Sequence, residues 1–340
     1  MNYSEEKKQQ LESILANYQM STYPNHSRIH PLNNFSTTNC YVKREDELGF
    51  GISGSKIRKY RSLIPFLKKN HYTEVVVIGS SQSNNVLGII QLLIENQIKP
   101  TLFLKKPSSN KVQGNFLLIQ LLVEKKTYHF ISQEDWENVE ALAHDYLNNN
   151  SARKIFILKE GASVKESLPG SLSLPLDILI NERENGIEFD HLFVDSGTGM
   201  MACALAIAFQ FILKKTTIHV LLCAANEDYF LKQLQNFHHV FIEMFQLKCD
   251  YPTNFILHKP ISSPSFGGTN TEIFREIKNI ARNHGILTDP IYTAKLFLES
   301  RRIIEEQGIE GNVLINHSGG ALTLAGFSSY LEKQIDTTAG

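Results

Sequence analysis

The side chain best suited to covalent chemistry is Lys56, which follows a glycine-rich loop and opens a predicted helix. Glycines let the backbone turn tightly and come close to a ligand. Two neighbouring cations, Arg58 and Lys59, and the helix N-terminus are expected to lower the pKa of this amine. Such a lysine can act as a nucleophile that forms a Schiff base with a carbonyl group. A basic turn that holds a surface anion is an equally weighted alternative for this stretch.

Two further loops are candidates for ligand binding. Residues 196–201 read Ser-Gly-Thr-Gly-Met-Met and combine small residues, two hydroxyls and a following helix N-terminus, as phosphate binding requires. Their spacing also satisfies a dinucleotide fingerprint, but no acidic residue ends the next strand, so a nicotinamide enzyme is the weaker alternative. The other loop, Gln82, Ser83 and Asn84, begins a helix and is either a capping group or a set of ligand contacts.

Strands alternating with helices are predicted to position these loops. Continuous apolar runs, typical of buried parallel strands, occupy residues 74–79, 99–104, 154–158, 191–195, 218–223 and 312–316. Helical patterns fall near 5–18, 57–67, 86–95, 112–126, 172–185, 200–213, 228–244, 269–283 and 292–306. This order predicts α/β layers with right-handed crossovers. Ligands of open α/β sheets lie beyond the carboxyl ends of the strands, where residues 79–85, 196–201 and 317–320 fall.

Composition and charge limit the classes of binding partner that are expected for this chain. The chain has 340 residues, of which 42% are hydrophobic, so it is long enough for one large domain or two interleaved ones. A net charge of −1 gives no indication of a nucleic-acid partner. Without a secretory signal or a run of about 18 apolar residues, the sequence predicts a soluble cytoplasmic protein with no membrane partner. Four separated cysteines and scattered histidines predict no metal site.

Several motifs, in order along the chain, resemble one known family. The chain resembles pyridoxal-phosphate enzymes of the tryptophan-synthase-β fold type, in the branch of D-cysteine desulfhydrase and 1-aminocyclopropane-1-carboxylate (ACC) deaminase. The resemblance covers about 28–330 and rests on residues 43–46, 55–59, 82–84, 114–115, 160–161, 196–199, 289–293 and 317–320. It implies two three-layer αβα domains with open, twisted, mostly parallel sheets and pyridoxal phosphate in the cleft between them. The larger domain would comprise residues 1–50 plus 166–340 and the smaller 51–165, in a chain that forms a homodimer.

The resemblance also implies roles for single residues. Lys56 resembles the Schiff-base lysine and the base that takes the α-proton, assisted by Ser83 and Tyr292. The other implied cofactor contacts are Asn84, Ser196, Gly197, Thr198, Gly199, Met200, Met201 and Thr293. The implied contacts to a small amino-acid substrate are Gln82, Ser83, Asn84, Phe266 and Ser318. Ser55 and Phe266 depart from the pattern, because relatives carry asparagine and a second tyrosine there.

Two of these residues bear on the reaction. Thr293 stands where relatives that open the ACC ring carry glutamate, and a hydroxyl leaves the pyridine ring largely neutral. A weaker electron sink suits removal of an α-proton followed by loss of a good leaving group such as a thiol, and Ser318 resembles the desulfhydrase side in the same way. The resemblance therefore predicts α,β-elimination of D-cysteine, or a similar β-substituted amino acid, to pyruvate, ammonia and hydrogen sulfide. The alternatives are an ACC deaminase, a nicotinamide-dependent oxidoreductase and a catalytically inactive pyridoxal-phosphate-binding protein.

Overall fold

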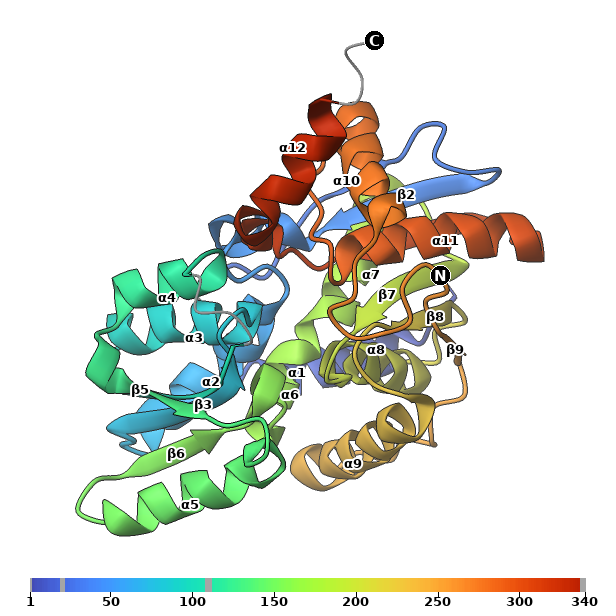
Figure 1. The fold of residues 1–340 in the computed structure, drawn as a ribbon. Coiled ribbons are helices and arrows are strands. Elements are labelled where there is room, and N and C mark those ends of the chain that lie inside the picture. Colours follow the sequence, from blue (N-terminus) through green and yellow to red (C-terminus); the bar gives the residue numbers. More distant parts are fainter. Residues whose placement is uncertain (1, 19–21, 108–111, 337–340) are drawn as a thin grey trace.

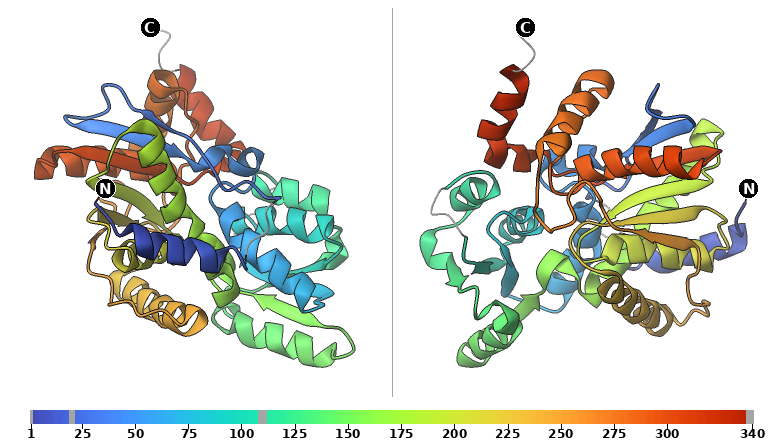
Figure 2. Two further views of the ribbon diagram at one scale, coloured as in Figure 1. Left: turned by 180° about the vertical axis from the view of Figure 1, so that it is seen from behind. Right: turned by 45° about the vertical axis from the view of Figure 1, so that its right-hand side comes forward.

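The chain folds into two lobes, each built on its own β-sheet (Figure 1). A computed structural model describes residues 2–18, 22–107 and 112–336. The large lobe holds a six-stranded sheet in the order β1-β2-β10-β7-β8-β9, and the small lobe a four-stranded sheet in the order β5-β4-β3-β6. Neighbouring strands are parallel throughout, except that β1 and β2 are antiparallel. Two further views show the lobes side by side (Figure 2).

The elements have the following bounds. The strands are β1 Ile29–Pro31, β2 Asn39–Arg44, β3 Glu74–Ser80, β4 Lys99–Lys105, β5 Tyr128–Ile131, β6 Ile155–Leu158, β7 His191–Ser196, β8 Thr217–Leu222, β9 Phe255–His258 and β10 Asn312–His317. The helices are α1 Glu5–Leu15, α2 Lys56–Lys69, α3 Asn84–Glu95, α4 Asn115–Leu122, α5 Val139–Asn149, α6 Leu168–Ser171, α7 Ser173–Asn185, α8 Met200–Phe211, α9 Glu227–Phe245, α10 Thr271–His284, α11 Thr293–Gln307 and α12 Ser328–Asp336. Short 3-10 turns include Glu45–Gly51, Glu160–Ala162 and Ala321–Phe327.

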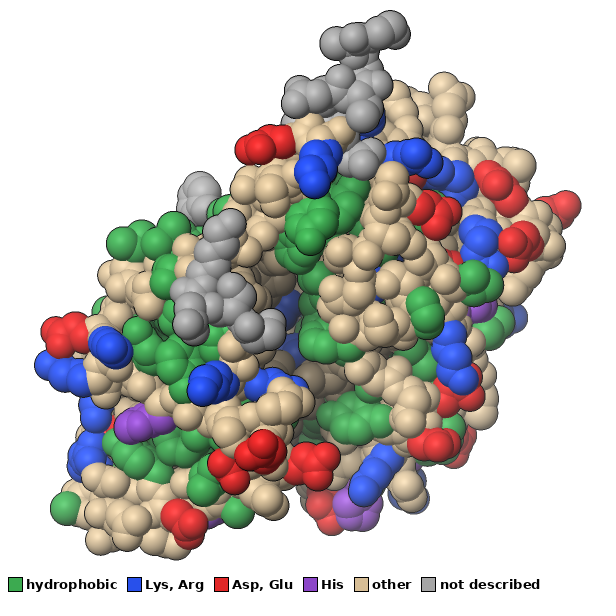
Figure 3. All heavy atoms as spheres, in the orientation of Figure 1, with side chains coloured by type: hydrophobic (Ala, Val, Ile, Leu, Met, Phe, Trp, Pro, Cys, Tyr) green, Lys and Arg blue, Asp and Glu red, His purple; other side chains and the backbone are tan. Residues whose placement is uncertain are grey.

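A hollow separates the two lobes on the face seen in Figure 3, and Lys or Arg atoms lie inside it. The lobes still touch beside it. The Ser55 N–H donates to the Ser318 carbonyl at 3.0 Å, and Gln113 Nε2 donates to the Gly326 carbonyl at 3.2 Å. These contacts join the segment before α2 and the segment before α4 to the C-terminal part of the large lobe.

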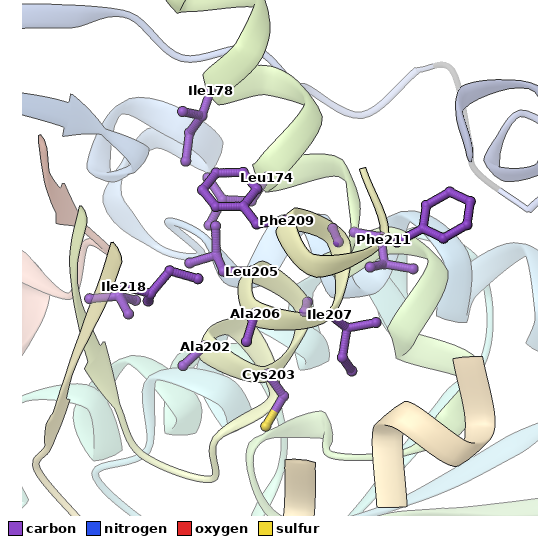
Figure 4. Close-up of a cluster of buried hydrophobic side chains, with 14 of the residues drawn as sticks. Leu174, Ile178, Ala202, Cys203, Leu205, Ala206, Ile207, Phe209, Phe211 and Ile218 are labelled. Atoms are coloured by element: carbon purple, nitrogen blue, oxygen red, sulfur yellow. The ribbon is translucent and has the colours of Figure 1, made fainter. Parts of the chain in front are cut away.

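Helices cover both faces of each sheet, because the side chains of buried strands alternate between two cores. In the small lobe, Val75 and Val77 pack under α2, α3 and α4, while Val76 and Ile78 pack against α5. In the large lobe, one face carries α1, α7, α8 and α9 and the other carries α10 and α11. Helix α8 lies wholly inside this lobe, so its alanines and large apolar side chains are almost all buried (Figure 4).

The structure confirms the α/β class with two mostly parallel sheets, and all six predicted strands are present within two residues of their expected ends. The predicted helix at 112–126 is wrong beyond Leu122, where the chain leaves α4 and continues into β5. Strands β1, β2, β5 and β9 were not predicted, because three of them are short edge strands and β2 mixes polar with apolar residues. In the described part of the chain, no helix has the length and apolar character to span a membrane. The boundaries 1–50 plus 166–340 and 51–165 remain our proposal for the domains.

Candidate active site

The loops singled out in the sequence converge where the two lobes meet. A Cβ atom on Gly54 would lie 2.3 Å from the Ser318 carbonyl, and one on Gly320 would lie 2.9 Å from Asn84 Nδ2. Both glycines have positive φ, so a larger residue would be strained as well as crowded. The ends of β3 and β10 and the start of α2 therefore face one another across contacts that only glycine permits.

Lys56 is the first residue of α2 and lies partly buried at this junction. Burial lowers the pKa of its amine, while the nearby carboxyl groups of Asp195 and Asp289 act in the opposite direction. An amine whose charged form is destabilised is more often neutral at physiological pH and is then a nucleophile. The direction of the pKa shift is the one that the sequence predicts, but its cause is burial and not the neighbouring cations.

A buried ionic cluster fixes the first turn of α2. In this Arg58 cluster, the guanidinium donates to both oxygens of Glu45, at 2.5 and 2.7 Å, and to Asp177 Oδ2 at 2.6 Å. The Lys43 ammonium also bonds to Asp177, and all four side chains are buried. Since Glu45 and Asp177 belong to the large lobe, Arg58 ties Lys56, two residues away, to the opposite side of the cleft.

The loop at 196–201 has the geometry of an anion site. Gly199 precedes α8 with φ +89°, which leaves the first backbone N–H groups of this 12-residue helix pointing into the loop. Thr198 packs against the 160–162 turn so tightly that a Cβ on Gly161 would lie 2.5 Å from its hydroxyl oxygen. The Met200 side chain is buried in the core, so this residue is able to offer its backbone, and not its side chain, to a ligand.

Lys59 lies one helical turn behind Lys56. Its Nζ donates to the Gly161 carbonyl at 2.8 Å. Burial first, and then the charge of Lys56, lower the pKa of Lys59 to about 7. Lys59 therefore links α2 to the turn that touches the loop at 196–201.

The loop before α3 contains one capping residue and one oriented amide. Ser83 Oγ accepts from the N–H groups of Asn85 and Val86 at 3.2 and 3.3 Å, so this residue caps the helix. Asn84 Oδ1 accepts from Asn115 Nδ2 at 2.7 Å and from the Thr323 hydroxyl at 3.0 Å. With its oxygen occupied twice, the Asn84 amide turns its Nδ2 group, a donor, toward Gly320.

Gln82 and Phe266 lie at the rim of the cleft, and Tyr292 lies behind Phe266. The Gln82 side chain is exposed and donates to the Gln113 carbonyl at 3.1 Å. Phe266 is 61% exposed, with its ring centroid 6.3 Å from that of Tyr292. Tyr292 itself lies deeper, since a Cβ on Gly197 would be 3.3 Å from its ring, and burial raises the pKa of its hydroxyl. The rings of Phe266 and Tyr292 therefore form a line from the molecular surface to the loop at 196–201.

Asp289 organises the start of α11. Its carboxylate accepts from the N–H groups of Ile291, Tyr292 and Thr293 and from the Thr293 hydroxyl, at 2.8 to 3.0 Å. The Thr293 hydroxyl in turn accepts from the Asp289 N–H at 2.8 Å. Thr293 is fully buried. The Thr293 hydroxyl is therefore already hydrogen-bonded to the Asp289 carboxylate. This contact was not apparent from the sequence, in which Thr293 was considered alone.

Similarity to known proteins identifies the family of this chain. The family described as pyridoxal-phosphate dependent enzyme matches residues 22–319. The chain belongs to this family. Among its relatives are a putative ACC deaminase of Thermotoga maritima, 28% identical over 84% of this chain and 90% of the relative, and the ACC deaminase of Cyberlindnera saturnus, 26% identical over 87% and 90%. The bifunctional mitochondrial D-cysteine desulfhydrase/ACC deaminase of Arabidopsis thaliana is 23% identical over 84% of this chain and 73% of the relative.

Solved structures share the fold. The structure of an ACC deaminase homologue superposes with a TM-score of 0.83 at 19% identity, covering 95% of this chain and 98% of the other. Maize serine racemase superposes with a TM-score of 0.64 at 12% identity, and all of both chains is covered. The fold is thus that of tryptophan-synthase-β-like enzymes, and the chain lies in the branch of ACC deaminases and D-cysteine desulfhydrases. The nicotinamide alternative is not supported.

The residues of the cleft fit pyridoxal phosphate, the cofactor of this family. Lys56 offers an amine of lowered pKa for the cofactor's aldehyde, and residues 196–201 with the N-terminus of α8 offer N–H groups for its phosphate. The Asn84 amide offers a donor for the ring hydroxyl. One further polar atom, Asp195 Oδ1, is shielded from solvent with no hydrogen-bond partner among the described residues. Asp195 could not be assigned to the site from the sequence, where its one distinguishing feature is its position at the end of a buried strand.

Proposed function

We propose that this enzyme releases ammonia from a small amino acid with the help of pyridoxal phosphate bound between the lobes. The observation that carries the proposal is the position of Lys56, an amine of lowered pKa that lies close to the carboxyl groups of Asp195 and Asp289 at the start of α2. A neutral amine at this place can bond to the cofactor's carbonyl carbon. Catalytic inactivity, the remaining alternative from another class, is excluded if turnover is observed.

The roles implied by the resemblance are consistent with this geometry and are proposed here for the individual residues. The backbone of residues 196–201 binds the phosphate, and Asn84 and Thr293 orient the ring. Bound pyridoxal phosphate supplies the electron sink, and the protein supplies orientation and proton transfer. When the substrate is D-cysteine, Lys56 accepts the α-proton, while Ser83 and Tyr292 hold the substrate close to it. ACC carries no α-proton, so this proton transfer applies to D-cysteine alone. Gln82, Phe266 and Ser318 line the substrate side.

Two substrates are candidates, and different observations favour each. The relatives named above are all called ACC deaminases, one of them also a D-cysteine desulfhydrase, which favours ACC. Thr293 and Ser318 favour D-cysteine, because Thr293 has no carboxylate to keep the pyridine ring protonated and Ser318 resembles the desulfhydrase side of the family. The Asp195 and Asp289 carboxyl groups near Lys56 make the pocket more acidic than Thr293 alone suggests, which weakens the argument for D-cysteine. We therefore place ACC first and D-cysteine second.

The experiment that separates them measures two products on one preparation. Release of 2-oxobutanoate from ACC and of pyruvate from D-cysteine is followed with equal concentrations of enzyme loaded with pyridoxal phosphate. Faster release of 2-oxobutanoate supports the first candidate, and faster release of pyruvate supports the second. Release of neither keto acid, from an enzyme that holds its cofactor, would show that the proposed reaction is wrong.

Lys56→Ala tests the residue that bonds to the cofactor. This variant is expected to lose the visible absorbance that borohydride abolishes in the native enzyme and to lose turnover with it, because the amine is gone. It should still retain some cofactor through the phosphate site. Lys69→Ala, an exposed position on the same helix, is the matched control and should behave as the native enzyme does. A Lys56→Ala protein that keeps the reducible absorbance would move the role to Lys59.

The homodimer implied by the resemblance also remains a proposal. Light scattering of the purified protein measures its mass directly. A mass near twice the 38.6 kDa of one chain is the expected result.

A further inference from the structure

The described segment between β9 and α10, residues 259–270, contains no helix or strand and carries Phe266 at the rim of the cleft (Figure 1). The Phe266 ring is tilted by 55° from that of Tyr292, and the ring centroids are 6.3 Å apart. The Gly268 N–H donates to the Ser265 carbonyl at 3.1 Å, which closes a tight turn around Phe266. This turn orders only the tip of the segment, so the spacing of the two rings depends on how the rest of the segment is held.

Two charged side chains of α11 bond to the backbone of this segment. Lys295 Nζ donates to the Ser263 carbonyl at 3.3 Å, and Glu299 Oε1 accepts from the Ser262 N–H at 2.7 Å. Lys295 and Glu299 are four residues apart, so they lie one above the other on the same face of the helix. Both side chains are buried. The helix therefore holds two consecutive residues of the segment.

Two more contacts complete the attachment. The Arg302 guanidinium donates to Glu299 Oε2 at 2.7 and 2.9 Å, which keeps the Glu299 carboxylate oriented. Asn270, the N-cap of α10, donates from Nδ2 to the Ser262 carbonyl at 2.5 Å. The N–H and the carbonyl of Ser262 are thus both fixed, one by α11 and the other by the start of α10.

The burial of Lys295 is not explained by packing. Burying an ammonium group costs free energy, and a hydrogen bond to a neutral carbonyl recovers only part of it. A methionine of similar length would fill the same space without that cost. The lysine therefore points to a role in placing the Ser263 carbonyl, and with it the turn that presents Phe266.

Helix α11 also sets the position of the other ring. Tyr292 is the residue that precedes this helix, and its N–H donates to the Asp289 carboxylate at 2.9 Å. Lys295 follows three residues later on the same helix. The spacing between Phe266 and Tyr292 is therefore determined by one helix of the large lobe and by the segment that this helix holds.

We propose that Lys295 and Glu299 are positioning residues that hold Phe266 against Tyr292, and that Phe266 selects small amino acids with no hydroxyl on the side that faces it. A phenyl ring offers no hydrogen bond, so a substrate hydroxyl beneath it would lose its bonds to water, whereas a methylene or a sulfur atom would lose little. The ring methylenes of ACC and the sulfur of D-cysteine meet this condition, and the hydroxyl of D-serine does not. The selection rests on the proposed function, since it takes the cleft as the site of a small amino acid.

The first test measures hydrogen exchange of the Ser262 amide in the full-length protein without cofactor, by mass spectrometry of peptides that contain it. Glu299→Ala removes the acceptor of this N–H, so exchange should become about ten- to a hundredfold faster, the effect of losing a hydrogen bond to a charged group. Glu299→Gln keeps an acceptor oxygen and should restore most of the protection. Glu305→Ala, at an exposed position on the same helix, is the control. Equal exchange in Glu299→Ala and Glu305→Ala would overturn the proposal.

The second test uses the enzyme loaded with pyridoxal phosphate. Lys295→Met should raise KM for ACC and for D-cysteine by about two- to tenfold, the effect of one hydrogen bond, and should change kcat less. Lys232→Met, at an exposed position on the same lobe, should leave both constants in place. Phe266→Ala should also raise KM, and adding Lys295→Met to it should cause no further rise, because Lys295 acts through Phe266. Effects that multiply in the double variant would show that Lys295 does not act through this ring.

The third test concerns the hydroxyl. Phe266→Tyr adds a group that can bond to a substrate hydroxyl, so the kcat/KM for D-serine divided by that for D-cysteine should rise by about tenfold relative to the native enzyme. An unchanged ratio would refute the selection by Phe266. If the native enzyme releases no keto acid from ACC, D-cysteine or D-serine while the Ser262 amide responds as expected, the proposed function fails and the selection with it. The attachment of the segment by Lys295 and Glu299 then stands.

Discussion

Asp195→Asn is expected to change how the stability of the cofactor-free protein depends on pH. The pKa of Asp195 rises from 3.8 to about 6 on folding, so the folded chain holds this proton more tightly than the unfolded chain. Between these two values the unfolded carboxyl group is ionised while the folded one is not, and the native protein loses stability as the pH rises. About two pH units at roughly 1.4 kcal/mol per unit gives ~3 kcal/mol, as an upper value for a side chain that is partly exposed.

The asparagine variant has no such ionisation. Its free energy of unfolding minus that of the native protein should therefore rise by ~3 kcal/mol between pH 3.8 and about 6, and then stay constant. Urea unfolding followed by circular dichroism, at a series of pH values, gives the free energy of unfolding for both proteins. The cofactor is left out because its binding would add its own contribution to stability. A difference for Asp195→Asn that is constant with pH, or that shrinks as the pH rises, would refute the reasoning.

Two further predictions concern the clamp on α2 and the choice of substrate. Arg58→Ala should lower the free energy of unfolding by about 3–5 kcal/mol, because it removes the buried guanidinium that bonds to both Glu45 and Asp177. Arg28→Ala, which removes an exposed ion pair, should change it by about 0–1 kcal/mol in the same urea experiment, and equal effects of the two would contradict the structural argument. Thr293→Glu should raise the ratio of 2-oxobutanoate released from ACC to pyruvate released from D-cysteine by about tenfold, the effect of ~1.4 kcal/mol on one barrier relative to the other. An unchanged ratio would show that this position does not select the substrate.

The central strands were predictable from the sequence because burial on both faces requires an uninterrupted apolar run. Strand β3, Glu74–Ser80, is such a case, and its valines enter both cores of the small lobe. Strand β2 was not predictable in the same way. Its Lys43 is buried because Asp177, from a helix far along the chain, neutralises it, and no local pattern records that pairing.

The residues of the candidate site divide in the same way, into those that the sequence could predict and those that it could not. Lys56 and the loop at 196–201 were recognisable because glycines and small residues next to a helix start have few other uses. Asp195 was not recognisable, because an acid at the end of a strand becomes significant only when the fold brings Lys56 and Ser318 to it. Thr293 was assigned a role as an isolated hydroxyl, whereas the structure shows that it exchanges hydrogen bonds with Asp289.

The Arg58 cluster has a mechanical consequence. It fastens the first turn of α2 to the large lobe, so this turn is the point about which the small lobe is least free to shift. Under a rotation about that point, each atom travels in proportion to its distance from it. Helix α5, at the outer edge of the small lobe, would sweep a long arc, while Lys56 would hardly move (Figure 1). Lys56, which we propose as the nucleophile, therefore lies beside the part of α2 that is bonded most directly to the large lobe.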